Sequence, residues 1–324
     1  MVAAGDGQTC GIAKTSFLYC WGKNDRGQLG DGTELPHSIP ARVLSDSAFA
    51  MVTAGTMSSC GITRSGVGYC WGLVHHDHHS TPVNIDPERR FTMLRAGVWM
   101  ICGLTTDGFI YCWSLTVSGA PASQLSGGVR FKALVNSENF FCGLSTDGKV
   151  YCWAADEYGR PTVPELRAAS PAAVKVTAGD QGYYTPSSSH LCIIRQGGAT
   201  YCWGSNGVGQ LGLGDRDPRM APTLLVSHEF ADISASERRT CGVAVTGVAY
   251  CWGWRVEPEI EASDTARAQL PGVRAAAVSL GADHFCFLTA GGAAFCAGAN
   301  GGGQLGTGTS GEVNQPLRKV LDPA

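Results

Sequence analysis

The chain has 324 residues, of which 44 are glycine, 14 are cysteine and only 16% are charged. This composition is typical of many short strands and tight turns, not of long helices or disordered segments. The formal net charge of −3 gives no basic field, and neither end carries a Lys/Arg-rich arm, which argues against nucleic acid as a partner. No apolar run approaches the roughly 20 residues of a membrane helix, so we expect no membrane span.

The cysteines organise the chain into repeats. They fall in seven pairs whose two members are always ten positions apart: Cys10 with Cys20, Cys60 with Cys70, Cys102 with Cys112, Cys142 with Cys152, Cys192 with Cys202, Cys241 with Cys251, and Cys286 with Cys296. Seven units of about 46 residues consume the whole length. We therefore expect one repeat domain over residues 1–324.

A turn signal lies inside each cysteine pair. The residue that ends a three-residue hairpin loop takes a left-handed conformation, which favours glycine. That position holds Ser16 in the first repeat and glycine in the other six: Gly66, Gly108, Gly148, Gly198, Gly247 and Gly292. The same register sets Gly11, Gly61, Gly103, Gly143 and Gly242 opposite Tyr19, Tyr69, Tyr111, Tyr151 and Tyr250. We expect each tyrosine ring to cover the bare glycine backbone.

In this register the two cysteines of a pair face each other on antiparallel strands, close enough to form a disulfide. Buried free thiols and metal ligands are the alternatives. The chain has no Cys-x-x-Cys knuckle, and a reduced cytosolic protein has no reason to place every thiol opposite another. We predict seven disulfides and a secreted, periplasmic or cell-surface location. Residues 1–5 already match the strand ends before other cysteines, so we expect that an export signal preceded them.

The two ends of the chain complement one another. Internal units begin with a short Pro-x-x-Val-like strand that the first unit lacks, and residues 316–320 supply such a strand after the last cysteine. We expect this last strand to pair beside the first and close the ring, which removes exposed edges. The predicted fold is an all-β, seven-bladed β-propeller closed by the N- and C-terminal strands. We expect one tryptophan to be buried in each of six blades, and Ala297 to replace it in the seventh: Trp21, Trp71, Trp113, Trp153, Trp203 and Trp252.

A longer motif surrounds the cysteine pairs. The pattern Trp-Gly-x-Asn-x-x-Gly-Gln-Leu-Gly occupies residues 21–30 and 203–212, and residues 300–306 repeat its second half. Together with the preceding Tyr-Cys, this pattern resembles the repeat of the regulator of chromosome condensation family over the whole chain. The resemblance implies a seven-bladed propeller. The cysteine pairs are similar to those of exported members, among them Crinkly-type plant receptor ectodomains and secreted bacterial relatives, which implies binding of another protein through loops on one face.

The loops before the first cysteine of each pair are the part of the repeat whose sequence varies. Variable loops on a constant frame are typical of a binding face, and Trp, Tyr, Phe, Met and Arg dominate interface hot spots. The alternative is that some of these side chains point inward and fill the axial channel. The partner-binding candidates are Met57, Trp99, Met100, Asn139, Phe140, Tyr183, Tyr184, Arg238, Arg239, Asp283 and His284. We predict a monomeric, non-enzymatic module that recognises another protein; a carbohydrate or cell-wall ligand is the alternative.

The second repeat replaces the long family loop with a run of histidines. His75, His76, His78 and His79 surround Asp77 and are half of all eight histidines in the chain. Neutral imidazoles gathered in one loop can ligate Zn²⁺ or Cu²⁺, with the carboxylate as a further ligand. One loop rarely supplies four tetrahedral ligands, so a solvated polar loop is the alternative to a metal site.

Catalytic signals are few. Residues 207–212 and 301–306 match Gly-x-Gly-x-x-Gly, but no helix is expected after either match and the family loop accounts for both. No serine elbow, His-Glu-x-x-His helix or phosphate-binding loop of the Walker type occurs. The enzyme alternative depends on Glu138, Asp180, Glu237 and Asp283 converging near the axis, or on His284 lining a deep axial cleft.

Overall fold

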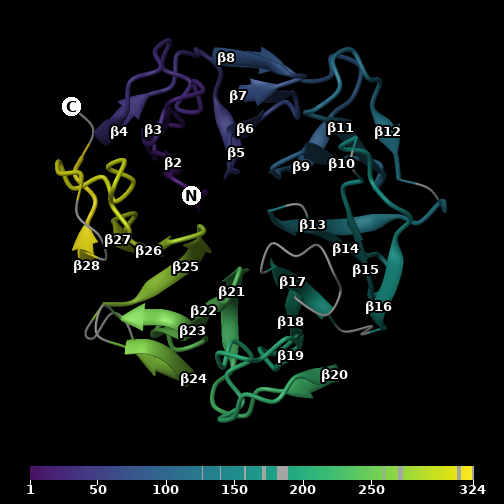
Figure 1. The fold of residues 1–324 in the computed structure, drawn as a ribbon, viewed down its shortest axis with the longest axis vertical. Coiled ribbons are helices and arrows are strands. Elements are labelled where there is room, and N and C mark those ends of the chain that lie inside the picture. The colour runs from purple at the N-terminus through teal and green to yellow at the C-terminus, as the bar shows by residue number, and fades with distance from the viewer. Residues whose placement is uncertain are drawn as a thin grey trace.

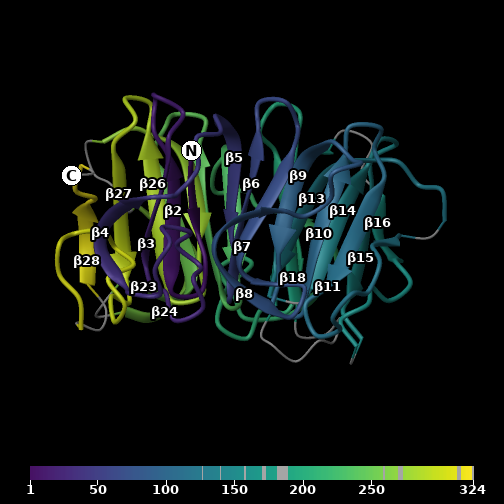
Figure 2. The same ribbon diagram turned by 90° about the horizontal axis from the view of Figure 1, so that it is seen from above.

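The computed structural model describes residues 1–125, 127–138, 140–156, 158–169, 173–180, 189–257, 260–268, 273–311 and 315–322. These residues form seven four-stranded antiparallel sheets set as blades around a central axis, with no helix among them (Figure 1). Seen from the side, the strands run between the two faces of the ring (Figure 2). The predicted all-β, seven-bladed propeller is confirmed. No helix that could cross a membrane occurs in the ranges just given.

Each blade is built from four strands that follow one another in the chain, the innermost first and the outermost last (Figure 1). The first three blades contain β1 (Val2–Ala4), β2 (Gln8–Ile12), β3 (Leu18–Gly22) and β4 (His37–Arg42); β5 (Phe49–Ala54), β6 (Ser58–Thr63), β7 (Gly68–Val74) and β8 (Asp77–Asn84); and β9 (Phe91–Ala96), β10 (Met100–Thr105), β11 (Ile110–Ser114) and β12 (Ser123–Gln124). The fourth and fifth contain β13 (Phe131–Ser137), β14 (Phe140–Ser145), β15 (Lys149–Ala154) and β16 (Glu165–Ala169); and β17 (Ala173–Asp180), β18 (Ser189–Arg195), β19 (Thr200–Gly204) and β20 (Arg219–Leu224). The last two contain β21 (Phe230–Ser236), β22 (Arg239–Ala244), β23 (Ala249–Glu257) and β24 (Ile260–Ala268); and β25 (Ala275–Leu280), β26 (His284–Thr289), β27 (Ala294–Gly298) and β28 (Gln315–Lys319).

The second and third strands of every blade pair in the predicted register, and a disulfide joins them in each. The seven bonds link Cys10 to Cys20, Cys60 to Cys70, Cys102 to Cys112, Cys142 to Cys152, Cys192 to Cys202, Cys241 to Cys251, and Cys286 to Cys296. All seven pairs are direct register partners, with Cα–Cα distances of 4.0 to 4.1 Å. The disulfide prediction is therefore confirmed for all 14 cysteines.

The hairpin turns between these strands have the predicted backbone conformation. The turn glycines have positive φ angles, for example 83° at Gly66 and 84° at Gly148. Ser16 takes the same left-handed conformation with a φ of 67°. The turn therefore forms also in the one repeat without a turn glycine.

The predicted Gly–Tyr pairs are also confirmed as register partners, but tyrosine is not the ring that needs the glycine. A Cβ atom built on Gly61 would lie 2.6 Å from Phe49 Cδ1, and one built on Gly143 would lie 2.5 Å from Phe131 Cδ1. Both phenylalanines lie at the start of an innermost strand and turn their rings over the glycine of the next strand. The innermost strand fills this space because it packs against the disulfide hairpin within the same blade.

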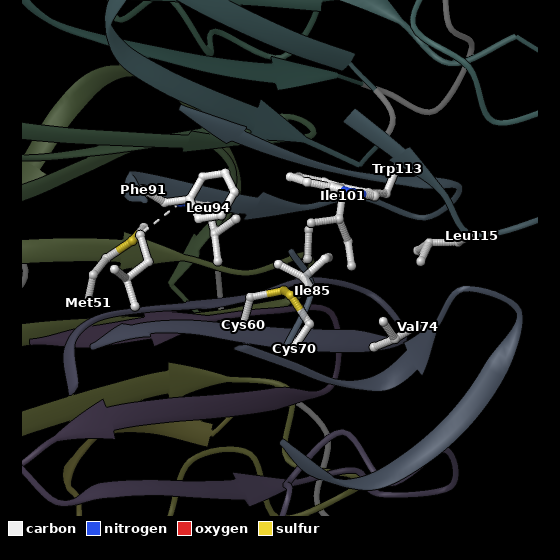
Figure 3. Packing of buried hydrophobic residues seen from close by; sticks show 12 residues of the cluster. Met51, Cys60, Cys70, Val74, Ile85, Phe91, Leu94, Ile101, Trp113 and Leu115 are labelled. Carbon is white, nitrogen blue, oxygen red and sulfur yellow. Dashed lines mark hydrogen bonds between the residues drawn. A yellow bond between two sulfur atoms is a disulfide. The ribbon is translucent and has the colours of Figure 1, made fainter. Parts of the chain in front are cut away.

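The hydrophobic core is divided into clusters that lie between neighbouring blades. Between the second and third blades, Met51 and the Cys60–Cys70 disulfide pack toward Phe91 and Trp113 (Figure 3). All six predicted tryptophans are at most 4% exposed and Ala297 is 6% exposed. The prediction that these positions form the core is confirmed.

Ring closure differs from the prediction. The last strand, β28, pairs with β27 inside the seventh blade, and no sheet of the described residues combines strands from both ends of the chain. The first blade packs against the seventh instead: the Ala4 amide donates to Ser279 Oγ at 2.9 Å, and Trp21 Nε1 donates to the Gln304 carbonyl at 2.9 Å. The expected strand exchange was wrong because residues 2–4 already provide the innermost strand of a complete first blade.

The long family loop fastens one blade to the next. The carbonyl oxygens of Gln28 and Gln210 accept hydrogen bonds at 2.9 Å from the indole N–H groups of Trp71 and Trp252, each in the following blade. Within the first loop, Asn24 Oδ1 accepts from the Leu29 amide at 2.9 Å and holds the turn. The recurring shape of this loop is therefore explained by blade packing.

Candidate functional site

The candidate site is a cavity on the propeller axis together with the loops around one of its ends. The cavity has a volume of about 500 Å³ and is lined by the seven innermost strands. The loops that follow these strands all lie on one face of the ring, because each innermost strand runs in the same direction along the axis. The hairpin turns between the second and third strands lie on the opposite face. We call the face that carries the loops after the innermost strands the axial-loop face.

Strand register shows which residues of the seven innermost strands lie at the same height along the axis. In every blade the residue paired with the first cysteine lies at this level, and the seven residues are Ala3, Thr53, Arg95, Val135, Thr177, Ser234 and Ser279. Several of the hydroxyl groups fasten neighbouring blades: Thr177 Oγ1 accepts from the Ala235 amide at 2.9 Å, and Ser234 Oγ accepts from the Leu280 amide at 3.1 Å. Arg95 is the one charged residue of the seven and has no such role.

Arg95 is partly exposed and lines the cavity. Its Nη1 atom donates to the Leu94 carbonyl at 2.8 Å, and no carboxylate of the described residues forms an ion pair with its guanidinium. Burial lowers the pKa of Arg95 to about 10, so the side chain remains a cation at neutral pH. A charge that is partly withdrawn from water and has no counter-charge is costly, which marks this position as unusual.

A second cation, Lys175, lies on the fifth blade and lines the same cavity. Its Nζ atom is ion-paired with Asp232 on the sixth blade, and Asp232 Oδ2 also accepts from the Val278 amide at 2.8 Å. Burial, and then the charge of Arg95, lower the pKa of Lys175 to about 8. Lys175 therefore has Asp232 as its counter-charge, whereas no ion pair to Arg95 is formed within the part of the chain that the structure describes.

Carboxylates gather at the end of the cavity on the axial-loop face. Asp6, Glu138 and Glu237 line the cavity, and Asp283 lies on the neighbouring loop of the seventh blade. Burial raises the pKa of Glu237 to about 7, with further contributions from the charges of Glu138, Asp283 and Asp6. Burial likewise raises the pKa of Asp6, although Lys23 opposes the shift. These four residues, from four different blades, therefore form one electrostatically connected rim, which we call the carboxylate rim.

The predicted partner-binding residues divide into three groups. Met57, Trp99 and Arg238 are partly exposed and Asp283 is exposed, all on the axial-loop face. Four others are buried, so the free protein does not present them: Met100 and His284 at 0% exposure, Phe140 at 5% and Arg239 at 7%. They begin the second strands of their blades, and these strands are covered on both sides by neighbouring blades. The remaining predictions, Asn139, Tyr183 and Tyr184, lie outside the described residues.

The buried His284 is a structural residue. Thr9 Oγ1 donates to the Gln304 carbonyl at 2.8 Å and therefore accepts from His284 Nε2, which lies 2.7 Å away. His190 Nε2 forms the corresponding hydrogen bond to Thr240 Oγ1 at 2.9 Å. Burial lowers the pKa of His190 to about 4, and burial together with the charge of Arg239 lowers the pKa of His284 to about 3. Both imidazoles are neutral braces between blades, and His284 does not line the cavity.

The histidine run forms a tight hairpin. His75 and His76 are the two turn residues, with φ angles of 50° and 75°, and Asp77 to His79 begin β8. His78 and His79 are consecutive strand residues, so their side chains leave opposite faces of the sheet. Among the residues that the structure describes, no three His, Cys, Asp or Glu side chains are placed to hold a metal ion. The geometry gives no support to the predicted Zn²⁺ or Cu²⁺ site.

The predicted convergence of acidic residues holds for Glu138, Glu237 and Asp283, and Asp6 joins them. The side chain of Asp180 lies outside what the structure describes. Arg95 was missed from the sequence, although a signal exists: it stands seven positions before Cys102, where most other repeats have a small uncharged residue. The two Gly-x-Gly-x-x-Gly matches lie in the blade-fastening loops, as expected.

The family model of the regulator of chromosome condensation (RCC1) repeat matches residues 17–62 and 197–243, and a second model of this repeat matches residues 275–304. The chain is similar to the probable E3 ubiquitin-protein ligase HERC4 of Homo sapiens, with 31% identity over 153 residues that cover 44% of this chain. That match spans only 14% of the length of HERC4. The ultraviolet-B receptor UVR8 of Arabidopsis thaliana is 27% identical over 141 residues, which cover 40% of this chain and 32% of UVR8.

Solved structures share the fold over nearly the whole chain. Prp20p of Saccharomyces cerevisiae superposes with a TM-score of 0.79 at 15% identity, covering 98% of this chain and 86% of Prp20p. The Crinkly ectodomain of the Arabidopsis thaliana receptor kinase ACR4 superposes with a TM-score of 0.61 at 20% identity, covering 91% of this chain and 93% of the ectodomain. The chain is therefore a seven-bladed propeller that carries repeats of the regulator of chromosome condensation type, with a disulfide in every blade.

Proposed function

We propose that this propeller is an extracellular, non-enzymatic binding module that recognises another protein through its axial-loop face. The observation that carries the proposal is the placement of Met57, Trp99 and Arg238, all partly exposed, on loops whose sequences differ while the frame repeats. Residues of these types anchor protein interfaces. The carboxylate rim at the centre of the same face favours a partner that presents basic groups there.

Two comparisons support a protein partner and the compartment. The structure of Prp20p is described together with its binding to Gsp1p and histones, so this fold can carry protein recognition. The ACR4 neighbour is the ectodomain of a receptor kinase. Seven disulfides in a chain with no free cysteine favour an oxidising compartment. We propose a secreted, periplasmic or cell-surface location on these grounds, and a monomer as the binding unit.

The test is affinity capture with a variant of the axial-loop face. Met57, Trp99 and Arg238 are changed together to Ala, and exported proteins of the source organism are offered to the immobilised protein. A specific partner should be retained by the unchanged protein and lost by the triple variant. Retention by both proteins would place recognition elsewhere.

The matched control removes the same number of side chains from the opposite face. Arg64, Arg90 and Arg130 lie at or beside the hairpin turns, where changing all three to Ala alters the surface and leaves the axial-loop face intact. This control should retain the partner. Circular dichroism melting of both variants separates loss of binding from loss of folding.

A second candidate function is acid–base chemistry in the cavity, because the pKa of Glu237 is about 7 and other carboxylates lie beside it, a combination common at active sites. Carboxylates do line the axial cavity, whereas His284 does not. Hydrolysis of glycoside or ester probes that is abolished by Glu237→Gln would favour this function. No turnover with either protein would favour the binding module.

A further inference from the structure

The face opposite the axial-loop face carries the hairpin turns, and we call it the hairpin-turn face. In five blades that are consecutive around the ring, from the sixth through the seventh and first to the third, a cation covers the turn (Figure 1). A Cβ atom built on Gly66 would lie 3.3 Å from Arg90 Cβ, and one built on Gly292 would lie 3.1 Å from Lys14 Cε. Each cation belongs to the next blade or immediately precedes it. We call this set the cation arc: Arg274, Lys14, Arg64, Arg90 and Arg130.

Hydrogen bonds to the turns hold three of these side chains in place. Arg64 donates from Nη2 to Ser16 Oγ, and Arg130 and Arg274 each donate from Nη1 to a carbonyl of the turn that they cover. A guanidinium has five N–H donors, so each of the three keeps donors that these bonds do not use. All five side chains of the cation arc are exposed.

The charge around the cation arc is not balanced. Within the ranges that the structure describes, none of the five cations forms an ion pair. In the same turns and in the connections beside them, Asp46 and Asp86 are already paired with Arg42 and Arg89. The described carboxylates of these segments that have no ion pair are Glu88, Asp107 and Asp322. Positive charge is therefore in excess here, although the whole chain has a formal net charge of −3.

The arc stops at the fourth and fifth blades. At the turn of the fifth blade a carboxylate takes the place of the cation, because a Cβ atom built on Gly198 would lie 3.1 Å from Glu229 Cβ. In the fourth blade the turn carries Asp147, which is paired with Lys149 at 2.7 Å. The frame therefore does not require a cation over the turn, and the arc is a property of five particular blades.

Aromatic rings lie beside the cations of the arc. Phe17, in the turn of the first blade, is 40% exposed, and the guanidinium carbon of Arg42 lies 4.2 Å from the centre of its ring. In the third blade, the guanidinium carbon of Arg130 lies 4.5 Å from the centre of the Phe109 ring. An exposed ring favours a ligand that has apolar surface as well as charge, which a sugar ring has and a small inorganic anion lacks.

We propose that the cation arc binds a linear anionic polysaccharide whose carboxylate or sulfate groups pair with successive blades. Guanidinium groups pair with planar oxyanions through parallel hydrogen bonds, and several weak contacts along one polymer add to a useful affinity. The choice of a polysaccharide rests on the extracellular location proposed above. The surface is separate from the axial-loop face, so one molecule can hold the polymer and a protein partner together.

The experiment is retention of the whole protein on three matrices at pH 7 and low salt. Heparin–agarose presents sulfate and carboxylate groups, polygalacturonate–agarose presents carboxylate alone, and dextran–agarose is neutral. The protein should be retained by at least one charged matrix, be released by added salt because exposed charges are screened, and pass through dextran. The matrix that retains it more strongly identifies the anion. Passage through both charged matrices would overturn the proposal.

Two triple variants with the same change in net charge separate the arc from a general charge effect. The test variant changes three members of the cation arc to Ala: Arg64, Arg90 and Arg130. The control changes three exposed arginines of the long loops and of β28 to Ala: Arg26, Arg216 and Arg318. By calorimetry with the soluble polymer, the test variant should bind at least about tenfold more weakly, because three surface charge pairs are lost. The control should bind like the unchanged protein, and equal weakening in both variants would overturn the proposal.

Two further measurements distinguish the polymer and the face. Single-stranded DNA should compete more weakly than the retained polysaccharide; stronger competition by DNA would overturn the choice of a polysaccharide. The variant of Met57, Trp99 and Arg238 should keep its polysaccharide binding, whereas the arc variant should keep its protein partner. Loss of polysaccharide binding in the former would overturn the assignment to the hairpin-turn face. Failure here is thus distinguishable from failure of the protein-recognition proposal.

Discussion

Phe131 occupies the space that a side chain at Gly143 would need: a Cβ atom on Gly143 would lie 2.5 Å from Phe131 Cδ1. Phe230 stands in the same relation to Gly242 in the sixth blade. Where the glycine is replaced, the phenylalanine is replaced too. The fifth blade has Ile193 with Ala173, and the seventh has Phe287 with Ala275. The same space inside a blade is therefore filled by a large side chain either from the innermost strand or from the second strand.

This exchange predicts a compensating pair of substitutions in the fourth blade. Phe131→Ala should lower the free energy of unfolding by about 3–5 kcal/mol through the cavity it leaves, and Gly143→Ile should destabilise by overpacking. The double variant, with both changes, reproduces the fifth blade and should recover a large part of both losses. Urea unfolding of the four proteins measures the coupling. Additive losses in the double variant would show that the two positions do not share one space.

The indole hydrogen bonds at the blade junctions predict unequal effects of Trp→Phe changes. Trp21→Phe removes a 2.9 Å bond to the Gln304 carbonyl at the closure of the ring and should cost about 0.5–1.5 kcal/mol beyond its packing loss. Trp153 Nε1 is buried without a partner among the described residues, so Trp153→Phe serves as the control and should cost less. Chemical denaturation of both variants makes the comparison, and a larger loss at Trp153 would contradict it.

The buried histidines predict a loss of stability in mild acid. The folded-state pKa values of His190 and His284, about 4 and about 3, lie below the ordinary value of 6.5. The unfolded chain therefore binds protons first as the pH falls below about 6.5, and each histidine then reduces the unfolding free energy by up to about 1.4 kcal/mol per pH unit. The pKa of Glu237, raised to about 7, acts in the opposite direction, since its contribution is lost as the pH rises from about 4.5 to 7.

His284→Gln isolates this effect, because the first blade has Gln8 at the equivalent position, bonded to the Gly55 carbonyl at 2.9 Å. The variant should fold at pH 7 and show a shallower fall in melting temperature between pH 6.5 and pH 4 than the unchanged protein. His78→Gln, an exposed change, is the control and should leave the slope as it is. An equal slope in all three proteins would contradict the role of His284.

The seven disulfides predict that the protein has no free thiol and that each bridge adds to its stability. Alkylation before reduction should label no cysteine, and alkylation after reduction should label all 14. Removing one bridge by changing Cys142 and Cys152 to Ala should cost about 2–3 kcal/mol, because each bridge closes a loop of about ten residues in the unfolded chain. Intact mass and urea unfolding check the two statements. Labelled thiols in the unreduced sample would contradict the predicted compartment.

Sequence reasoning reached the blades through local chemistry. Between Cys60 and Cys70, for example, Gly66 occupies the turn position that needs a positive φ, so the hairpin could be predicted from neighbouring residues alone. The predicted pairing of the last strand with the first strand was wrong, because a repeating sequence pattern does not show which of its strands begins a blade. The assignment of residues 1–324 as one domain remains a prediction.

The site was harder to predict than the frame. The variable loops were found, but burial of Met100 and His284 depends on blades that cover them from both sides. Convergence of Glu138 with Glu237 requires the ring to close, since the two residues are far apart in the chain. Only the strand register of all seven blades shows that Arg95 is the one charged residue among those paired with the first cysteines.

The most direct test of the central claim is hydrogen–deuterium exchange of the captured complex. If the axial-loop face recognises the partner, binding should slow exchange in the loops around Met57, Trp99, Arg238 and Asp283 and leave the hairpin turns at Gly66, Gly108 and Gly247 unchanged. Protection confined to the hairpin turns, with the four axial loops exchanging as in the free protein, would contradict it.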